Sequence, residues 1–166
     1  MYQDNKESKT PQARLEAYLR LRRLAHETAP GNVGVIDVSE DSAKPFGILM
    51  DISLPQGNAT IVAFISGDAS FYAGTGGGVI GGIGHEKVRN AARNFVISSA
   101  KFLDKMTVTT AYPLPEPGKV RFYVLTPKCI FTYEANEIDL RKNEFAPLYA
   151  AGHQLLNALL SAAQPK

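Results

Sequence analysis

Gly74-Thr-Gly-Gly-Gly-Val-Ile-Gly-Gly-Ile-Gly84 holds seven of the fourteen glycines of the chain. The stretch lies between a short apolar run, Ala69–Ala73, and a basic amphipathic run that begins at His85. Glycine reaches positive φ without steric cost and lets another chain or a ligand approach the backbone, but it loses more conformational entropy on folding than other residues. We therefore expect this stretch to join a strand to a helix and to carry the unusual feature of the protein.

The size and composition of the chain predict an ordinary globular protein. A chain of 166 residues buries about two thirds of its unfolded surface, which is enough for a real core. The composition, 45% hydrophobic and 20% charged, is typical of globular domains. We expect residues 1–9 to form a flexible tail and residues 10–166 to form a single domain.

Charge, cysteine content and the N-terminal sequence exclude several classes of partner and compartment. A net charge of +2 is too small for strong nonspecific binding to nucleic acid. The lone Cys129 cannot form an internal disulfide, so nothing indicates an oxidising compartment. The polar N-terminal sequence lacks the apolar core of a signal peptide, and no apolar run is long enough to span a membrane. The sequence thus predicts a cytoplasmic protein with neither nucleic acid nor membrane as partner.

Three stretches have the periodicity or the end signals of helices. Thr10-Pro11 is a favourable helix start, because threonine caps free amides and proline fits the first turn, and this helix should reach about Thr28. A second helix should span His85–Met106, with an apolar stripe at steps of three and four residues. The third, Pro147–Gln164, contains no charged residue.

Six short runs have the residue preferences of strands and are separated by turn residues. They span Val33–Val38, Gly47–Leu54, Thr60–Ser66, Ala69–Ala73, Val120–Thr126 and Cys129–Ala135. Their close spacing favours antiparallel hairpins. We therefore predict an α+β single domain, a mostly antiparallel sheet of about six strands in the order α-β-β-β-β-α-β-β-α, with helices packed on the sheet.

This order of elements resembles that of type III secretion chaperones and, more distantly, that of roadblock and profilin modules. The resemblance rests on element order, and no residue motif carries it. What it implies is a role in binding another protein.

The glycine-rich stretch has two possible binding chemistries. The spacing from Gly76 to Gly81 matches the dinucleotide fingerprint G-x-G-x-x-G, but the parallel strand and acidic residue of that motif are missing, so we predict no nucleotide cofactor. The free amides at the start of the second helix, with basic residues nearby, are suited to a phosphate or a carboxylate. A structural role is the competing interpretation, in which Glu86 complements the helix dipole. The candidate residues for a ligand or a partner are Gly76, Gly77, Gly78, Gly81, Gly82, Gly84, His85, Lys87, Arg89 and Arg93.

The charges are segregated along the chain. Residues 85–106 carry five basic and two acidic side chains, whereas residues 31–84 carry one lysine and five acids. Such segregation suits the steering of an acidic protein partner, or the orientation of two subunits.

Catalytic and metal-binding patterns are weak. The three histidines lie in three different predicted elements, so we predict no metal site. His85 is the best general base in the sequence, with Asp68, Ser70 or Cys129 as conceivable companions, but its simpler role is to cap the second helix. We predict no catalytic residue.

The uncharged last helix, Pro147–Gln164, is predicted to contact another subunit. A solvent-exposed helix normally carries charge on its outer face, so we expect Tyr149, His153, Leu156 and Leu160 to contact another subunit. The leading hypothesis is a non-catalytic protein-binding or assembly module that forms a homodimer. The alternative is a protein or enzyme that binds a small anion or phosphate-containing ligand through Gly74–His85.

Overall fold

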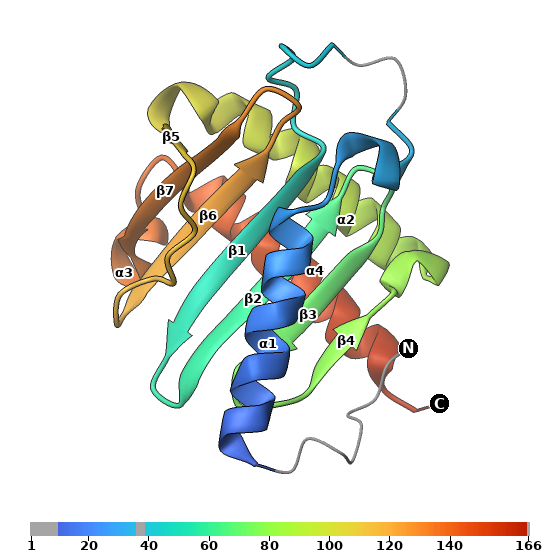
Figure 1. Ribbon diagram of the computed structural model, residues 1–166, viewed down its shortest axis with the longest axis vertical. Coiled ribbons are helices and arrows are strands. Elements are labelled where there is room, and N and C mark those ends of the chain that lie inside the picture. Colours follow the sequence, from blue (N-terminus) through green and yellow to red (C-terminus); the bar gives the residue numbers. More distant parts are fainter. Residues whose placement is uncertain (1–9, 36–38, 166) are drawn as a thin grey trace.

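The protein is built on one antiparallel sheet with helices on both faces (Figure 1). The computed structural model describes residues 10–35 and 39–165. In these residues the sheet has seven strands in the order β4-β3-β2-β1-β6-β7-β5, and every neighbouring pair is antiparallel. The α+β antiparallel fold is thus confirmed, with seven strands where we expected about six. The strands are β1 (Gly47–Leu54), β2 (Gly57–Phe64), β3 (Ala69–Ala73), β4 (Gly78–Ile80), β5 (Thr107–Thr109), β6 (Lys119–Leu125) and β7 (Ile130–Asn136).

The helices form two unequal layers. Helix α1 crosses one face of the sheet, and α2 and α4 lie together on the opposite face (Figure 1). Within the described residues, no helix is long and apolar enough to cross a membrane. The α-helices are α1 (Pro11–His26), α2 (Glu86–Ser99), α3 (Glu137–Leu140) and α4 (Ala146–Ala163), and the 3₁₀ helices are η1 (Pro30–Val33), η2 (Gly82–Gly84) and η3 (Ala100–Lys105).

The predicted start of the first helix is confirmed. The hydroxyl of Thr10 accepts a hydrogen bond from the backbone N–H of Ala13 at 3.1 Å, and Pro11 occupies the first turn. The second predicted helix begins one residue after His85, but its α-helical part ends at Ser99 and a 3₁₀ helix continues to Lys105.

Alternating residues of β1 supply the two halves of the core. Ile48 and Met50 face α2 and α4, whereas Leu49 faces α1. Helix α4 lies very close to β1 at Gly152, because a Cβ atom there would be 2.5 Å from the Met50 Cε and 3.1 Å from the Phe95 Cζ. Glycine at this position therefore sets the distance between α4 and the sheet.

The prediction of a strand at Val33–Val38 was wrong for the residues that the structure describes. Pro30 opens the 3₁₀ helix η1, which Val33 ends, and Gly34 follows with φ of +77°. This left-handed turn is incompatible with a continuing strand. Residues 36–38 lie outside the described part of the chain.

Two strands and one helix were not predicted. The three-residue strand β4 lies inside the glycine-rich stretch and pairs with β3, and β5 pairs with β7 at the other edge of the sheet. The helix is the single turn α3, which directly follows β7. These elements are too short to produce a readable periodicity, since each spans only three or four residues.

Candidate functional site

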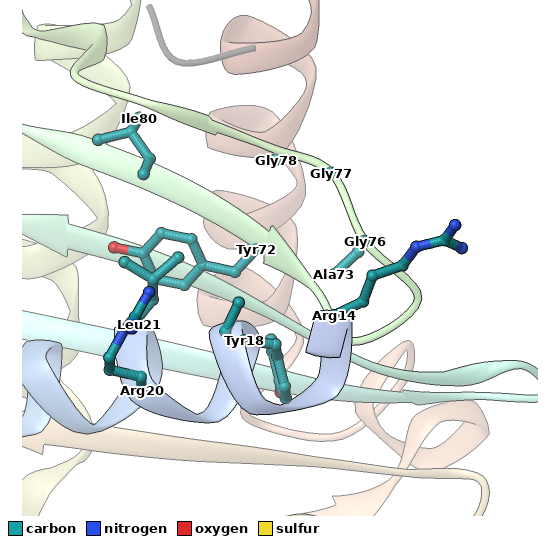
Figure 2. Close-up of a pocket in the computed structure, with 11 residues that line it drawn as sticks. Arg14, Tyr18, Arg20, Leu21, Tyr72, Ala73, Gly76, Gly77, Gly78 and Ile80 are labelled. Carbon is teal, nitrogen blue, oxygen red and sulfur yellow. The ribbon is translucent and has the colours of Figure 1, made fainter. Parts of the chain in front are cut away.

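The glycine-rich stretch is divided by β4 and serves two faces of the sheet. Gly76, Gly77 and Gly78 line a hollow beside α1 (Figure 2). Gly84 and His85 line a separate groove beside α4, on the opposite face (Figure 1). The candidate residues predicted from this one stretch therefore do not form one site.

The second of these hollows, which we call the α2–α4 groove, lies between the start of α2 and the C-terminal half of α4. Its volume is about 560 Å³. It forms where η2 passes close to both helices, since a Cβ atom at Gly82 would lie 2.5 Å from the Val88 Cγ1 and 2.9 Å from the Leu159 Cδ2. The groove is lined by Gly84, His85, Glu86, Lys87, Val88, Asn157, Ala158, Ser161 and Ala162.

Polar groups of both helices face the α2–α4 groove. His85 holds the N-cap position of α2, but its ring makes no capping hydrogen bond. Glu86 lies in the first turn of α2, where its charge complements the helix dipole. Lys87, Asn157 and Ser161 add one cation, an amide and a hydroxyl. The groove thus offers hydrogen-bonding groups at an exposed surface, and among the described residues that line it Glu86 is the one acidic side chain.

Two arginines that we predicted to bind a ligand or a partner instead make hydrogen bonds within the fold. The Arg89 Nη1 donates to the carbonyl oxygen of Ile83 at 2.8 Å. The Arg93 Nη2 donates to the carbonyl oxygen of Ser66 at 2.9 Å, next to a longer bond from its Nε to Ile65. These bonds fasten α2 to η2 and to the turn between β2 and β3. Gly81, another candidate, has φ of +78° and precedes η2.

The four residues predicted to contact another subunit differ in exposure. Tyr149 is 8% exposed and donates its hydroxyl hydrogen bond to the Glu137 Oε1 at 2.6 Å. Burial and this carboxylate raise the pKa of Tyr149 to about 12. His153 and Leu156 are half-buried, and burial lowers the pKa of His153. Leu160, at 44% exposed, presents the largest apolar surface of the four.

An uncharged row of exposed residues follows the outer side of α4. Its members recur at steps of three and four residues, which places them on one face of the helix. The row continues into the α2–α4 groove through Asn157 and Ser161. It consists of Pro147, Ala150, Gln154, Asn157, Leu160 and Ser161.

A buried polar cluster beneath α1 was not predicted. The Arg22 guanidinium donates to both carboxylate oxygens of Asp51, with Nη2 at 2.7 Å from Oδ2, and its Nη1 donates to the carbonyl oxygen of Tyr112 at 2.9 Å. The Thr60 hydroxyl donates to Asp51 at 2.6 Å and lies 2.8 Å from the Tyr18 hydroxyl. Burial and the charge of Asp51 raise the pKa of Tyr18.

His26 extends this cluster with an aromatic stack. Its ring stacks on Tyr112 at 4.3 Å between centroids and meets the edge of Tyr123 at 4.6 Å. Burial and the nearby Arg22 lower the pKa of His26 to about 3. Since Asp51 is fully buried and Arg22 is 7% exposed, the cluster is closed to a substrate, and it ties α1 to the sheet. The signal in the sequence is the spacing of Tyr18, Arg22 and His26 at steps of four.

The residues suggested for catalysis are not brought together. In the described part of the chain, no hydrogen bond joins the His85 ring to Asp68, Ser70 or Cys129. Across residues 10–35 and 39–165, no group of three or more His, Cys, Asp or Glu side chains is arranged to hold a metal ion.

Comparisons with known proteins assign no family to this chain. A scan of protein-family models, a search of curated proteins and a search of solved structures each found no match.

Proposed function

We propose that the chain is a non-catalytic, cytoplasmic protein-binding or assembly module that forms a homodimer through α4 and the α2–α4 groove. The observation that carries this proposal is the uncharged exposed row of α4, which runs into a groove of about 560 Å³. The lone cysteine agrees with a reducing compartment.

The charge pattern of this face fits the usual anatomy of an interface. Interfaces are depleted of charge at their centre and polar at their rim. The outer row of α4 supplies the uncharged centre, and the exposed cation Lys87 of the neighbouring helix, which lines the groove, lies at the rim. In a two-fold dimer Lys87 stays at the periphery, where water and salt screen the repulsion between like charges.

The length of α4 is sufficient for such a contact. A helix of 18 residues is about 27 Å long, and the small side chains Ala150 and Ser161 allow a second helix to approach. Leu160, 44% exposed, supplies apolar area that gains from burial at about 25 cal/mol per Å². A different protein that used the same face would be acidic, because residues 85–106 beside the groove carry five basic and two acidic side chains.

The alternative function, binding of a small anion by Gly74–His85, is restricted by the fold. The two halves of the stretch line hollows on opposite faces of the sheet, so one small ligand cannot contact both. The form that the geometry still supports is a phosphate held near His85 and Lys87 in the α2–α4 groove. Titration with inorganic phosphate, followed through the amide resonances of residues 81–87, tests it, and unchanged resonances at millimolar phosphate would exclude it.

The homodimer is tested by light scattering on the full chain across the micromolar range. We expect the wild-type chain to reach the mass of a dimer and Leu160→Glu to remain a monomer, because a carboxylate would be buried within the contact. Leu54→Glu is the matched control, since Leu54 is 46% exposed, close to the 44% of Leu160, but lies at the end of β1. A wild-type monomer at high micromolar concentration, or a Leu160→Glu dimer, would refute the proposal.

A further inference from the structure

A second hollow, which we call the α1–β4 hollow, lies on the face of the sheet opposite to α4. Helix α1 forms one wall, the Tyr72 ring lies across the base, and the backbone of Gly76–Gly78 with Ile80 forms the other wall (Figure 2). Its volume is about 190 Å³. It is lined by Arg14, Ala17, Tyr18, Arg20, Leu21, Tyr72, Ala73, Gly76, Gly77, Gly78 and Ile80.

The walls of the hollow are apolar and the space fits one compact group. Ala17, Leu21 and Ile80 present aliphatic surface, and the Tyr18 hydroxyl is already bonded to Thr60. The glycines leave the opposite wall without side chains. A cavity of roughly 150 Å³ lined by apolar side chains is known to bind benzene. The α1–β4 hollow is therefore large enough for one aromatic ring or one branched aliphatic chain.

One arginine, Arg20, gives the hollow a positive charge at one end, and the stem of a second, Arg14, borders the other end. Arg14 and Arg20 both line it, and their separation of six residues places them about 9 Å apart along the helix. The Arg14 stem packs against Gly76, where a Cβ atom would lie 2.8 Å from the Arg14 Cδ, and its guanidinium extends past Gly76 (Figure 2). Arg20 lies at the other end, beside Leu21 (Figure 2). Within residues 10–35 and 39–165, no Asp or Glu lines the hollow.

We infer that the α1–β4 hollow binds a small apolar carboxylic acid, with an aromatic or branched aliphatic body between Tyr72 and Ile80 and its carboxylate at Arg20. An apolar ligand gains from leaving water, and a guanidinium pairs with a carboxylate through charge-assisted, often bidentate hydrogen bonds. The site lies on the other face of the sheet from α4, so it goes beyond the proposed homodimer and does not depend on it.

The probe is 3-phenylpropionate, and its neutral counterpart is 3-phenylpropanol. We expect the acid to shift the amide resonances of Gly76–Gly78 and Ile80 in the ¹⁵N-labelled full chain, saturably at millimolar concentration or below, and to leave residues 84–87 unchanged. The alcohol should bind about tenfold more weakly, because it lacks the negative charge that pairs with the guanidinium in a charge-assisted bond. Leu160→Glu should bind the acid as the wild-type chain does, which separates this site from the dimer contact.

Variants test each part of the site. Arg20→Gln should lower the affinity for the acid about tenfold and leave the affinity for the alcohol unchanged. Arg23 is an exposed arginine of α1 that does not line the hollow, so Arg23→Gln should change neither affinity. Ala17→Leu should fill the hollow and abolish binding of both the acid and the alcohol. A native amide spectrum of this variant would show that it still folds.

Three results would overturn the inference. One is the absence of saturable shifts at Gly76–Gly78. The second is equal affinity for the acid and the alcohol, and the third is full affinity for the acid in Arg20→Gln. If an acidic peptide with an apolar side chain binds while 3-phenylpropionate does not, the hollow serves a protein partner and the small-acid assignment is wrong.

Discussion

Replacing His26 with phenylalanine should remove a loss of stability that the wild-type chain undergoes in mild acid. In the folded chain the pKa of His26 is lowered from 6.5 to about 3 by burial and by Arg22. Above the pKa of His26 in the unfolded chain, the ring is neutral in both the folded and the unfolded chain, so its titration costs no stability there. As the pH falls below that value, the unfolded state takes up a proton that the folded state excludes, and stability decreases by about 1.4 kcal/mol per pH unit. Between pH 7 and pH 5 the expected loss is about 2 kcal/mol.

The assay is urea denaturation followed by circular dichroism at a series of pH values. Phenylalanine preserves the stack on Tyr112, at 4.3 Å between ring centroids, and removes two buried ring nitrogens that lack hydrogen-bond partners. The difference in unfolding free energy between His26→Phe and the wild-type chain should therefore grow by about 2 kcal/mol from pH 7 to pH 5. His85→Gln, which leaves His26 in place, should keep the wild-type slope. Parallel curves for His26→Phe and the wild-type chain would refute the reasoning.

Three further predictions concern a buried ion pair, the packing of α4 and the cap of α1, and each is measured by urea denaturation. Asp51→Ala leaves the buried Arg22 guanidinium without its partner and should cost about 3–5 kcal/mol, so a loss below about 1 kcal/mol would contradict the buried ion pair. Gly152→Ala should destabilise the chain by about 1–3 kcal/mol, because the added methyl group would contact Met50. This loss is expected although alanine is the better helix former by about 1 kcal/mol. A stabilised variant would mean that α4 lies farther from β1. Thr10→Ala removes the cap of α1 and should cost about 1 kcal/mol, and unchanged stability would show that the cap contributes nothing.

Periodicity and end signals predicted the long elements of the fold. Thr10-Pro11 gave the start of α1, and the apolar pattern of the next helix gave the position of α2. The hairpin of β6 and β7 is also confirmed, and each of its four strand ends lies one residue from the predicted position. These elements are long enough for burial of one face to leave a pattern in the residues.

The site could be predicted only in part, because its geometry depends on contacts between distant residues. Sequence placed Gly76 and His85 in one loop, but the pairing of β4 with β3 separates them onto two faces of the sheet. Arg22 and Asp51 are 29 residues apart, and nothing local marks them as partners. A charged residue in a helix or a strand is expected to face solvent, because charged side chains are rarely buried without a partner. The partner can be identified only when the fold is known.

The two helical layers are held to the sheet by different forces, and temperature should therefore act on them to different extents. The layer of α2 and α4 rests on apolar contacts, which weaken on cooling. Part of the hold on α1 comes from an enclosed ion pair, whose dehydration penalty falls as the temperature rises. Both contributions therefore weaken in the cold. At high temperature the apolar contribution levels off while the ion pair still gains, so hydrogen exchange recorded at two temperatures should show the protection of α1 rising relative to that of α2 and α4.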